Sequence, residues 1–249
     1  MFLSHLISFG TKQSHYKFRE FPSYTSSCPI LHSLPGIICN TNTIFENILD
    51  ISHSVTLKKG DIVYPDIEKA PIIYLKKGKL CIYNINQEGK IFTPHFIFHG
   101  SLIYEAFFLT EGQFNIMPIK ALEDSTIFVF SPELTFENLL EINPMLVKNL
   151  AYSQAVKDLC YSKLACINMY VKPTNRLCLF LYEMFSLYQK RKIHPNITQS
   201  ELALLLNMHK VTLSNIIAQL KANNILEAFT KTEINILNPE ELLRYGLSE

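Results

Sequence analysis

The hydrophobic pattern changes once along the chain, from short apolar runs to a helical repeat. Between residues 51 and 130, the apolar runs are rich in Ile, Val, Tyr and Phe, which favour β-strands. The runs are "DIVY", "PIIYL", "KLCIYNI", "KIFTPHFIF" and "STIFVF". From Pro132 onwards, apolar residues return every three or four positions, as they do on one face of a helix. The pattern predicts an α+β protein with strands first and helices second.

Glycines separate the predicted strands at regular intervals. They lie 18, 11, 11 and 12 residues apart and are Gly60, Gly78, Gly89, Gly100 and Gly112. This spacing indicates short antiparallel strands joined by tight turns, which need a positive φ. We expect residues 41–143 to form an antiparallel β-roll, or jelly roll, which can enclose a small ligand or be filled by side chains.

Two helix starts are marked by a capping residue followed by proline. Ser131 precedes Pro132, and Asn143 precedes Pro144. A Ser or Asn side chain can accept a hydrogen bond from the first turn, and proline suits the first helical position. We therefore expect one helical segment from Pro132 and a longer one from Pro144, which lasts until the break at Pro173.

The longer segment carries a heptad seam. Its members alternate at spacings of four and three residues and are Leu146, Leu150, Ser153, Lys157, Cys160, Leu164, Ile167 and Val171. A long, narrow seam is typical of a coiled coil between two chains, and its polar members usually fix the register. The alternative is a helix that packs on its own domain. We predict that residues 144–171 form a dimerisation helix and that the seam from Leu146 to Ile167 is the dimer interface.

The stretch "ITQSELALLLNMHKVTLSNIIAQLKANNIL" predicts a helix-turn-helix. Thr198 and Glu201 have the spacing of a capping box for the first helix, and "NMH" gives a short turn. Asn223 and Asn224 end the second helix, because asparagine tolerates the left-handed conformation. "ILEAFTKTEINIL" then predicts a two-stranded wing, and "NPEELLRY" predicts a final capped helix. Residues 172–249 are therefore expected to form a winged helix-turn-helix domain.

The second helix of this motif has an outer face without the usual mixture of Glu and Lys. At about 100° per residue, the inner face consists of Thr212, Leu213, Ile216, Ile217 and Leu220. The outer face consists of Lys210, Val211, Ser214, Asn215 and Ala218. One cation, one hydroxyl and one amide among small or apolar side chains suit a surface that contacts a partner.

Composition limits the classes of protein. The 249 residues, 48% of them hydrophobic, allow one large or two modest domains. A formal net charge of +1 neither indicates nor excludes a nucleic-acid partner, because nucleic-acid binding depends on local charge. We expect no secretory signal, and no apolar run reaches membrane-spanning length. Six scattered cysteines suit a reducing cytoplasm, where we expect the protein, without a membrane partner. Residues 1–40 form an N-terminal extension of unknown role.

In this order of segments the chain resembles the CRP/FNR family of bacterial transcription regulators. The resemblance covers about residues 45–240 and is carried by "LKKGDIVY", "YLKKGKLCIYNINQEGK", "HGSLIYEAFFLTEGQ" and, above all, the helix-turn-helix stretch. Within the family, "HKVTLSNII" is most similar to the regulators of reductive dehalogenation that sense chlorinated phenols. The resemblance implies a sequence-specific DNA-binding regulator, not an enzyme. It also implies a homodimer, with RNA polymerase as a further candidate partner.

The resemblance places the DNA contacts on the helix-turn-helix. The candidate residues are Lys210, Val211, Ser214, Asn215, Thr198, Gln199 and His209. Most family members have Glu at the Val211 position and Arg at the Asn215 position, and both types read G·C pairs. Here the Asn215 amide can pair with adenine, Val211 can contact a thymine methyl, and Lys210 suits a phosphate. We therefore expect an A/T-rich pseudo-palindromic site in double-stranded DNA.

The β-roll departs from the cyclic-nucleotide branch of the family. Glu105 is kept, but Tyr104 replaces a glycine, and Asn115 and Ile116 replace the Arg-Ser pair that binds the phosphate. Burying a charged phosphate without its arginine would cost several kcal/mol. Cyclic AMP is therefore not expected as the effector. Phenol-sensing relatives have a lysine roughly where Glu105 stands, so a phenolate is not expected either.

The cysteines and histidines are the candidate ligands for a cofactor. Cys28 and Cys39 are too few and too far apart for the cysteine cluster of the oxygen-sensing branch, so no iron–sulfur cluster is expected. His95 and His99 flank "FIF", which leaves haem open as a ligand, although histidines without a metal are commoner in such a pair. No metal site is predicted.

An unknown small molecule, or a redox or gas signal, is expected to act on the β-roll. The candidate effector-binding residues are Tyr104, Glu105, Asn115, Tyr161 and Ser162, the last two standing where the family's effector touches the long helix. Two other classes compete. One is a small-molecule-binding β-roll protein that no longer binds DNA, against which Lys210 and the basic "KRK" argue. The other is a jelly-roll enzyme, which would need a clustered set of metal-binding His and Glu residues.

Overall fold

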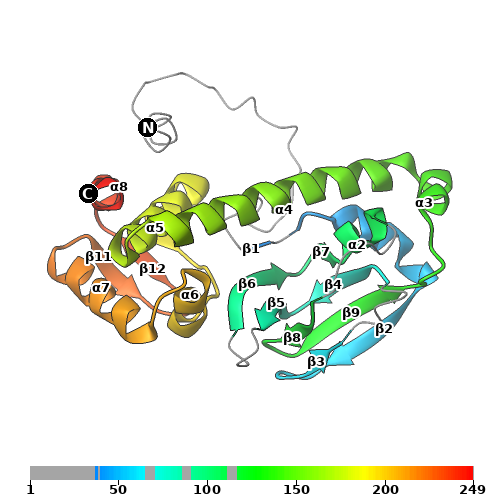
Figure 1. The fold of residues 1–249 in the computed structure, drawn as a ribbon, viewed down its shortest axis with the longest axis horizontal. Coiled ribbons are helices and arrows are strands. Elements are labelled where there is room, and N and C mark those ends of the chain that lie inside the picture. The colour runs from blue at the N-terminus through cyan, green and yellow to red at the C-terminus, as the bar shows by residue number, and fades with distance from the viewer. Residues whose placement is uncertain (1–36, 39, 65–70, 86–90, 111–116, 249) are drawn as a thin grey trace, which may run out of the picture.

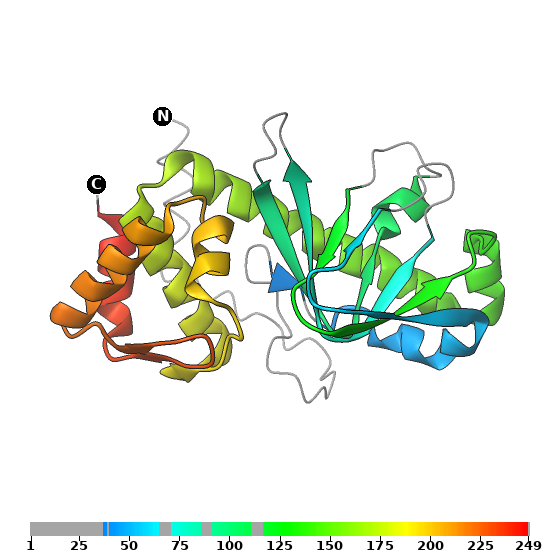
Figure 2. The same ribbon diagram turned by 90° about the horizontal axis from the view of Figure 1, so that it is seen from below.

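One long helix, α4 (Pro144–Tyr170), connects the two lobes of the molecule. The computed structural model describes residues 37–38, 40–64, 71–85, 91–110 and 117–248. The first lobe is a β-roll and the second is a small helical lobe with a wing, and they lie side by side along α4 (Figures 1 and 2). In the part of the chain so described, no helix is both long and apolar enough to cross a membrane.

Two sheets form the first lobe. One has the strand order β1-β6-β5-β8-β3 and the other β2-β9-β4-β7. The strands are β1 (Ile37–Ile38), β2 (Ser52–Leu57), β3 (Ile62–Val63), β4 (Ile73–Lys77), β5 (Lys79–Ile85), β6 (Ile91–Phe98), β7 (Ser101–Ile103), β8 (Ile119–Ala121) and β9 (Ser125–Phe130). The strands predicted at β3, β4, β5, β6 and β9 are confirmed. Two short helices, η2 (Thr43–Ile51) and α2 (Glu105–Leu109), complete the lobe.

Part of the predicted N-terminal extension, whose role the sequence left unknown, belongs to this sheet. Ile37 and Ile38 pair with Phe96 and Ile97 of β6. The pairing is parallel, whereas the other described pairs of the lobe are antiparallel. The two-residue strand was too short to leave a periodic signal in the sequence.

Three of the predicted turn glycines adopt the expected conformation. Gly60, Gly78 and Gly100 have φ values of 99°, 103° and 76°. At Gly78 the need is also steric, because an added Cβ would collide with Ser125 at the start of β9. Gly89 and Gly112 lie outside the described residues.

The helix predicted from Pro132 begins four residues later. Helix α3 (Phe136–Ile142) has Thr135 as its N-cap. The Thr135 hydroxyl accepts from the Asn138 amide at 3.2 Å, and the Asn138 side chain accepts from the Thr135 amide at 3.0 Å. This reciprocal cap satisfies two amides, whereas Ser131 accepts only from Glu133, at 3.2 Å, within a turn. The predicted second start is confirmed, since Asn143 caps α4 through the Met145 amide at 3.0 Å.

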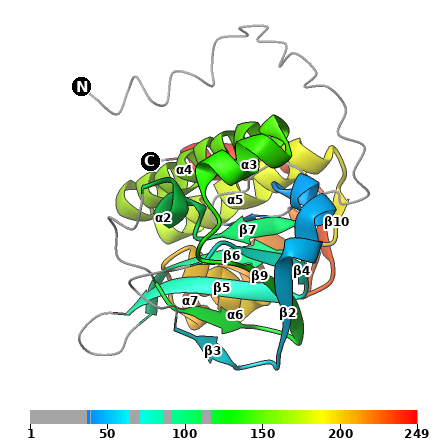
Figure 3. The ribbon, with the colours of Figure 1, turned by 90° about the vertical axis from the view of Figure 1, so that its right-hand side faces the viewer.

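The heptad seam of α4 faces the β-roll of its own chain, so its assignment to a dimer interface was wrong. Six of the seven residues proposed for the interface are buried within the single chain, and the seventh, Ile167, is partly exposed. The six are Leu146, Leu150, Ser153, Lys157, Cys160 and Leu164. α4 and α3 lie on one side of the stacked strands (Figure 3). A heptad pattern indicates that one face of a helix is buried, but it does not identify the surface that buries it. In this chain the β-roll provides that apolar surface.

Polar groups of the β-roll meet the two polar members of the seam. The Asn42 amide donates to the Ser153 hydroxyl at 2.8 Å. Lys157 forms a buried ion pair with Glu105 at the start of α2. Cys160 packs in the β-roll core and donates to the Val156 carbonyl at 2.8 Å, so it does not face its own copy across a two-fold axis. The two polar residues that interrupt the apolar seam therefore have polar partners within the same chain.

The second lobe has the predicted winged helix-turn-helix arrangement. Its elements are α5 (Pro173–Tyr188), β10 (Lys192–Ile193), α6 (Gln199–Leu205), α7 (Lys210–Ala222), β11 (Leu226–Phe229), β12 (Ile234–Ile236) and α8 (Pro239–Leu247). The capping box of Thr198 and Glu201 is confirmed. Of the two asparagines expected to end α7, Asn224 has the left-handed backbone and Asn223 does not, and Asn207 in the turn is also left-handed. β10 adds a third strand to the predicted two-stranded wing.

The two lobes share one core and one buried ion pair. Phe96 and Phe98 of β6 pack in the same hydrophobic cluster as α6 and α7. Lys79, at the start of β5, is 2% exposed, and its Nζ lies 2.8 Å from Glu201 Oε2 and 2.9 Å from the Asn196 carbonyl. The Lys79 ammonium also lies 5.3 and 5.2 Å from the rings of Phe96 and Phe98. Lys79 therefore ties the β-roll to the capping box of α6.

This ion pair makes a testable contribution to stability. Lys79→Met should lower the free energy of unfolding by about 3 kcal/mol, because it leaves a largely buried carboxylate without its partner. The matched control is Lys77→Met on β4, since Lys77 is exposed and should change stability by less than about 0.5 kcal/mol. Urea unfolding followed by circular dichroism measures both. Equal midpoints for the two variants would refute a structural role for the Lys79 pair.

Candidate effector pocket and nucleic-acid interface

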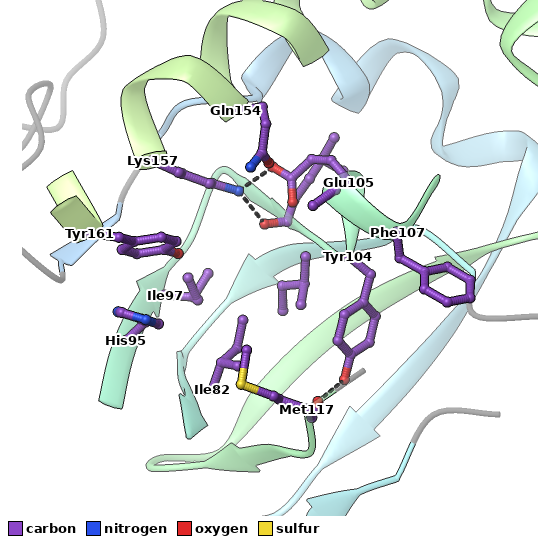
Figure 4. Close-up of a pocket in the computed structure, with 13 residues that line it drawn as sticks. Ile82, His95, Ile97, Tyr104, Glu105, Phe107, Met117, Gln154, Lys157 and Tyr161 are labelled. Atoms are coloured by element: carbon purple, nitrogen blue, oxygen red, sulfur yellow. Dashed lines mark hydrogen bonds and ion pairs between the residues drawn. The ribbon is translucent and has the colours of Figure 1, made fainter. Parts of the chain in front are cut away.

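A cavity of about 190 Å³ lies between the β-roll, α2 and α4 (Figure 4). Apolar side chains form most of its wall and include Ile82, Ile97, Leu102, Ile103, Phe107 and Met117. Tyr104 and Glu105 enter from the start of α2, and Gln154, Lys157 and Tyr161 enter from α4. The alternation of side chains along β6 turns His95 and Ile97 into the cavity.

Tyr104 occupies a backbone conformation that suits glycine. Its φ is 71°, and it is the N-cap of α2 without a side-chain capping bond. A non-glycine residue in this conformation is strained unless its surroundings hold it. Here the Tyr104 hydroxyl donates to the Met117 carbonyl at 2.8 Å, and the ring fills part of the cavity. Burial raises the pKa of this phenol, which keeps it neutral.

The Lys157–Glu105 ion pair forms the charged end of the cavity. The side chains are 5% and 4% exposed, and Lys157 Nζ also donates to the Leu102 carbonyl at 2.9 Å. Two buried charges of opposite sign neutralise each other, whereas either one alone would be costly. The pair also joins α4 to the loop between β7 and α2.

His95 and Tyr161 form an aromatic wall of the cavity, and Tyr161 lies one turn after Lys157 on α4. Their ring centroids lie 3.8 Å apart at an interplanar angle of 29°. Burial lowers the pKa of His95 to about 4, so its ring is neutral at pH 7. Burial is also the main cause of the raised pKa of Tyr161. Within the described residues, His95 Nδ1 is buried and has no hydrogen-bond partner.

The candidate effector residues are only partly brought together. Tyr104, Glu105 and Tyr161 line the cavity as predicted, but Ser162 is exposed and does not. Asn115 lies outside the described residues. The sequence analysis missed Lys157, although a lysine within an apolar seam was a signal that it needed a buried partner.

The two candidate haem ligands do not form a shared site. His95 is buried in the cavity, whereas His99 is exposed beyond the end of β6. Among the described residues, no group of three or more His, Cys, Asp or Glu side chains could hold a metal ion. The two thiols for which burial raises the pKa to about 12, Cys81 and Cys178, are poor nucleophiles at neutral pH.

The two faces of α7 are divided as the sequence predicts. Leu213, Ile216, Ile217 and Leu220 are buried against the lobe, and Thr212 is half-buried at the boundary. The outer face is exposed and consists of Lys210, Val211, Ser214, Asn215 and Ala218. Val211 is 66% exposed on this outer face.

The other candidate DNA-binding residues lie around this face. His209 is the exposed N-cap of α7 and makes no side-chain capping bond, so its imidazole is available at the helix start. Gln199 is half-buried at the start of α6. The Thr198 hydroxyl accepts from the Glu201 amide at 3.2 Å, so it already has a structural role.

Arg176 positions the turn between α6 and α7, a role that the sequence analysis did not find. Its Nη1 donates to the carbonyls of Leu206 and Asn207, both at 2.8 Å, and its Nε donates to the Val171 carbonyl at 2.6 Å. From α4, the Asn168 side chain donates to the Leu205 carbonyl at 2.9 Å. The end of α4 therefore holds the end of α6 directly.

Comparisons with known proteins agree with this arrangement. Residues 175–245 match the Crp-like helix-turn-helix domain. A cAMP-activated global transcriptional regulator CRP from Pasteurella multocida (strain Pm70) is 22% identical over 179 residues, covering 70% of this chain and 85% of the regulator.

The fold is similar to that of solved regulators. CprK complexed with OCPA has a TM-score of 0.70 at 22% identity, covering 84% of this chain and 98% of CprK. A CooA mutant from Carboxydothermus hydrogenoformans has a TM-score of 0.70 at 17% identity, covering 84% of this chain and 99% of CooA. The chain therefore has the fold of these regulators, a β-roll joined to a winged helix-turn-helix lobe. Within that lobe, residues 175–245 carry a Crp-like helix-turn-helix domain.

His95 makes stability depend on pH in a defined direction. Its pKa is about 4 in the folded chain against an ordinary value of 6.5, so between these values the unfolded state binds more protons. The stabilising contribution is complete above about pH 6.5 and is lost as the pH falls towards 4. Between pH 7 and pH 5 we expect a loss of about 2 kcal/mol from this group.

Urea unfolding at pH 7, 6 and 5 measures this loss. His95→Phe keeps a ring against Tyr161 but cannot be protonated, so the wild type should lose stability relative to this variant as the pH falls. The control is His53→Phe, at an exposed histidine on β2, which should follow the wild type. A constant difference between wild type and His95→Phe from pH 7 to pH 5 would contradict the burial of a neutral imidazole.

Proposed function

We propose that this chain is a homodimeric transcription regulator in which a small molecule, bound between the β-roll and α4, sets the affinity for DNA. One observation carries the proposal: the helix that closes the pocket is the helix that holds the DNA-binding lobe. Lys157 and Tyr161 line the pocket from α4. Asn168, two turns later on α4, bonds to α6. A change in the pocket can therefore reach the helix-turn-helix along one rigid element.

The exposed side of α4 supports the dimer. From Met145 to Ser162, exposed residues recur there at spacings of three and four, and Met169 follows seven residues later. They are Met145, Lys148, Tyr152, Ala155, Leu159, Ser162 and Met169. Leu159 and Met169 are 73% and 71% exposed. This second heptad seam lies opposite the one that packs on the β-roll. Exposed apolar side chains in a heptad register are typical of a coiled coil, here with a second copy of α4.

The face of α7 supports recognition of A·T pairs. Lys210, Val211, Ser214 and Asn215 are exposed, and no described segment of the chain covers them. The Asn215 amide can form two hydrogen bonds with adenine, and the Val211 methyls can contact a thymine methyl. Lys210, at the start of α7, suits a phosphate. A two-fold dimer would present two such helices to successive major grooves, about 34 Å apart.

The effector acts by preferring one of two arrangements of the lobes. Such a shift needs a ligand with different affinities for the two states. The contacts that would change are the pair of Lys79 with Glu201 between the lobes and the bond from Asn168 of α4 to the Leu205 carbonyl. Cyclic AMP activates the related CRP. We do not expect it to act here, since Asn115 and Ile116 replace the phosphate-binding pair.

The dimer is tested by a charge on the exposed seam. Leu159→Glu places two like charges at the two-fold contact, so the variant should be monomeric at low micromolar concentration by light scattering. The matched control is Tyr64→Glu beside β3, because Tyr64 is 72% exposed and lies on the β-roll. This control should stay dimeric. A dimeric Leu159→Glu variant would disprove the assignment of the exposed seam.

The proposed DNA contacts of α7 are tested by selecting binding sites from a random duplex library. We expect A/T-rich pseudo-palindromes. Asn215→Ala should lose about 1–3 kcal/mol at one adenine position and relax the preference there. Lys210→Ala should weaken all sequences alike and reduce the salt dependence by about one charge. A fixed G·C pair in each half-site core would overturn the proposed readout, and no selective binding at all would overturn the proposed function.

A further inference from the structure

The cavity combines a neutralised ion pair with mostly apolar walls. Among its described lining residues, Glu105 and Lys157 are the charged side chains, and they are paired with each other. We propose that this pocket takes an uncharged, mostly apolar molecule the size of one six-membered ring. This inference deepens the proposed function and rests on it for the regulatory role of the pocket.

The ion pair selects against charged ligands of either sign. An anion would approach Lys157 but would also meet the Glu105 carboxylate. If it displaced that carboxylate, it would leave a buried acid without its partner. A cation would leave Lys157 unpaired in the same way. Only an uncharged ligand leaves the pair and the bond from Lys157 to the Leu102 carbonyl intact.

The volume limits the ligand to one ring with a small substituent. The cavity measures about 190 Å³. An apolar protein cavity of about 150 Å³ is known to bind benzene, so the space here allows slightly more. Ile82, Ile97, Ile103 and Phe107 offer such a molecule apolar contacts, and their walls exclude water from it.

The aromatic wall of the cavity suits a flat ligand. The rings of His95 and Tyr161 are stacked on each other, and both residues line the cavity. The Tyr104 hydroxyl already donates to the Met117 carbonyl, so it makes no demand for a polar ligand group. A flat, mostly apolar ring therefore matches this wall.

Three probes of nearly the same shape test the charge preference. Benzyl alcohol is neutral, benzoate is an anion and benzylammonium is a cation at pH 7. Isothermal titration calorimetry on the full chain should show saturable binding of benzyl alcohol and at least tenfold weaker binding of both ions. Equal or tighter binding of benzoate or benzylammonium would overturn the inference, as would no binding of any of the three.

Isosteric variants turn the same experiment into a test of the ion pair. Glu105→Gln leaves Lys157 unpaired, so the affinity for benzoate should rise at least tenfold while that for benzylammonium does not. Lys157→Met should favour benzylammonium instead. Tyr104→Phe is the control, because it changes the wall without changing the charge, and it should keep the wild-type order of probes. Unchanged probe selectivity in folded Glu105→Gln would contradict the role given to the pair.

DNA binding separates this inference from the proposed function. The affinity for the selected DNA site is measured with and without saturating benzyl alcohol. If the probe binds with the expected charge order and the DNA affinity changes, both conclusions stand. If it binds and the DNA affinity is unchanged, the ligand class stands and the regulatory role of the pocket fails. If an ion binds more tightly, the ligand class fails whatever the DNA result.

Discussion

The packing of one face of α4 on the β-roll is the contact on which the other assignments depend. It buries the seam from Leu146 to Leu164 and closes the effector pocket with Lys157 and Tyr161. It also fixes which side of α4 is free for a second chain. Because the same helix ends against α6 through Asn168, the pocket, the dimer face and the DNA-binding lobe share one rigid element. The interlobe pair of Lys79 and Glu201 adds a second connection at the capping box.

The sequence predicted the order of elements well because each carried a local signal. The capping box of Thr198 and Glu201, the left-handed Asn224 after α7 and the two faces of α7 all follow from short-range rules. The surface that covers a helix is not a local property. The heptad from Leu146 to Leu164 was therefore identified as a seam but given the wrong partner. The pairing of β1 with β6 depended on a contact between distant segments and had no local signal.

Some residues of the candidate pocket could be predicted from the family resemblance, and others only from the packing of α4. Tyr104, Glu105 and Tyr161 were placed at the pocket by resemblance, and they line it. The partner of Glu105 was not predicted, since a lysine on α4 meets α2 only after the helix is laid on the roll. This pair is the reason for proposing a neutral ligand.

Disulfide cross-linking of Leu159→Cys tests the central claim most directly. If α4 lies on its own β-roll and meets its own copy through the exposed seam, residue 159 of each chain lies near the two-fold axis. Mild oxidation should then give a covalent dimer that still binds the selected DNA, whereas Cys160, one residue away and buried, should not cross-link in the wild type. A variant that stays uncross-linked, or a cross-linked dimer that no longer binds DNA, would contradict the account.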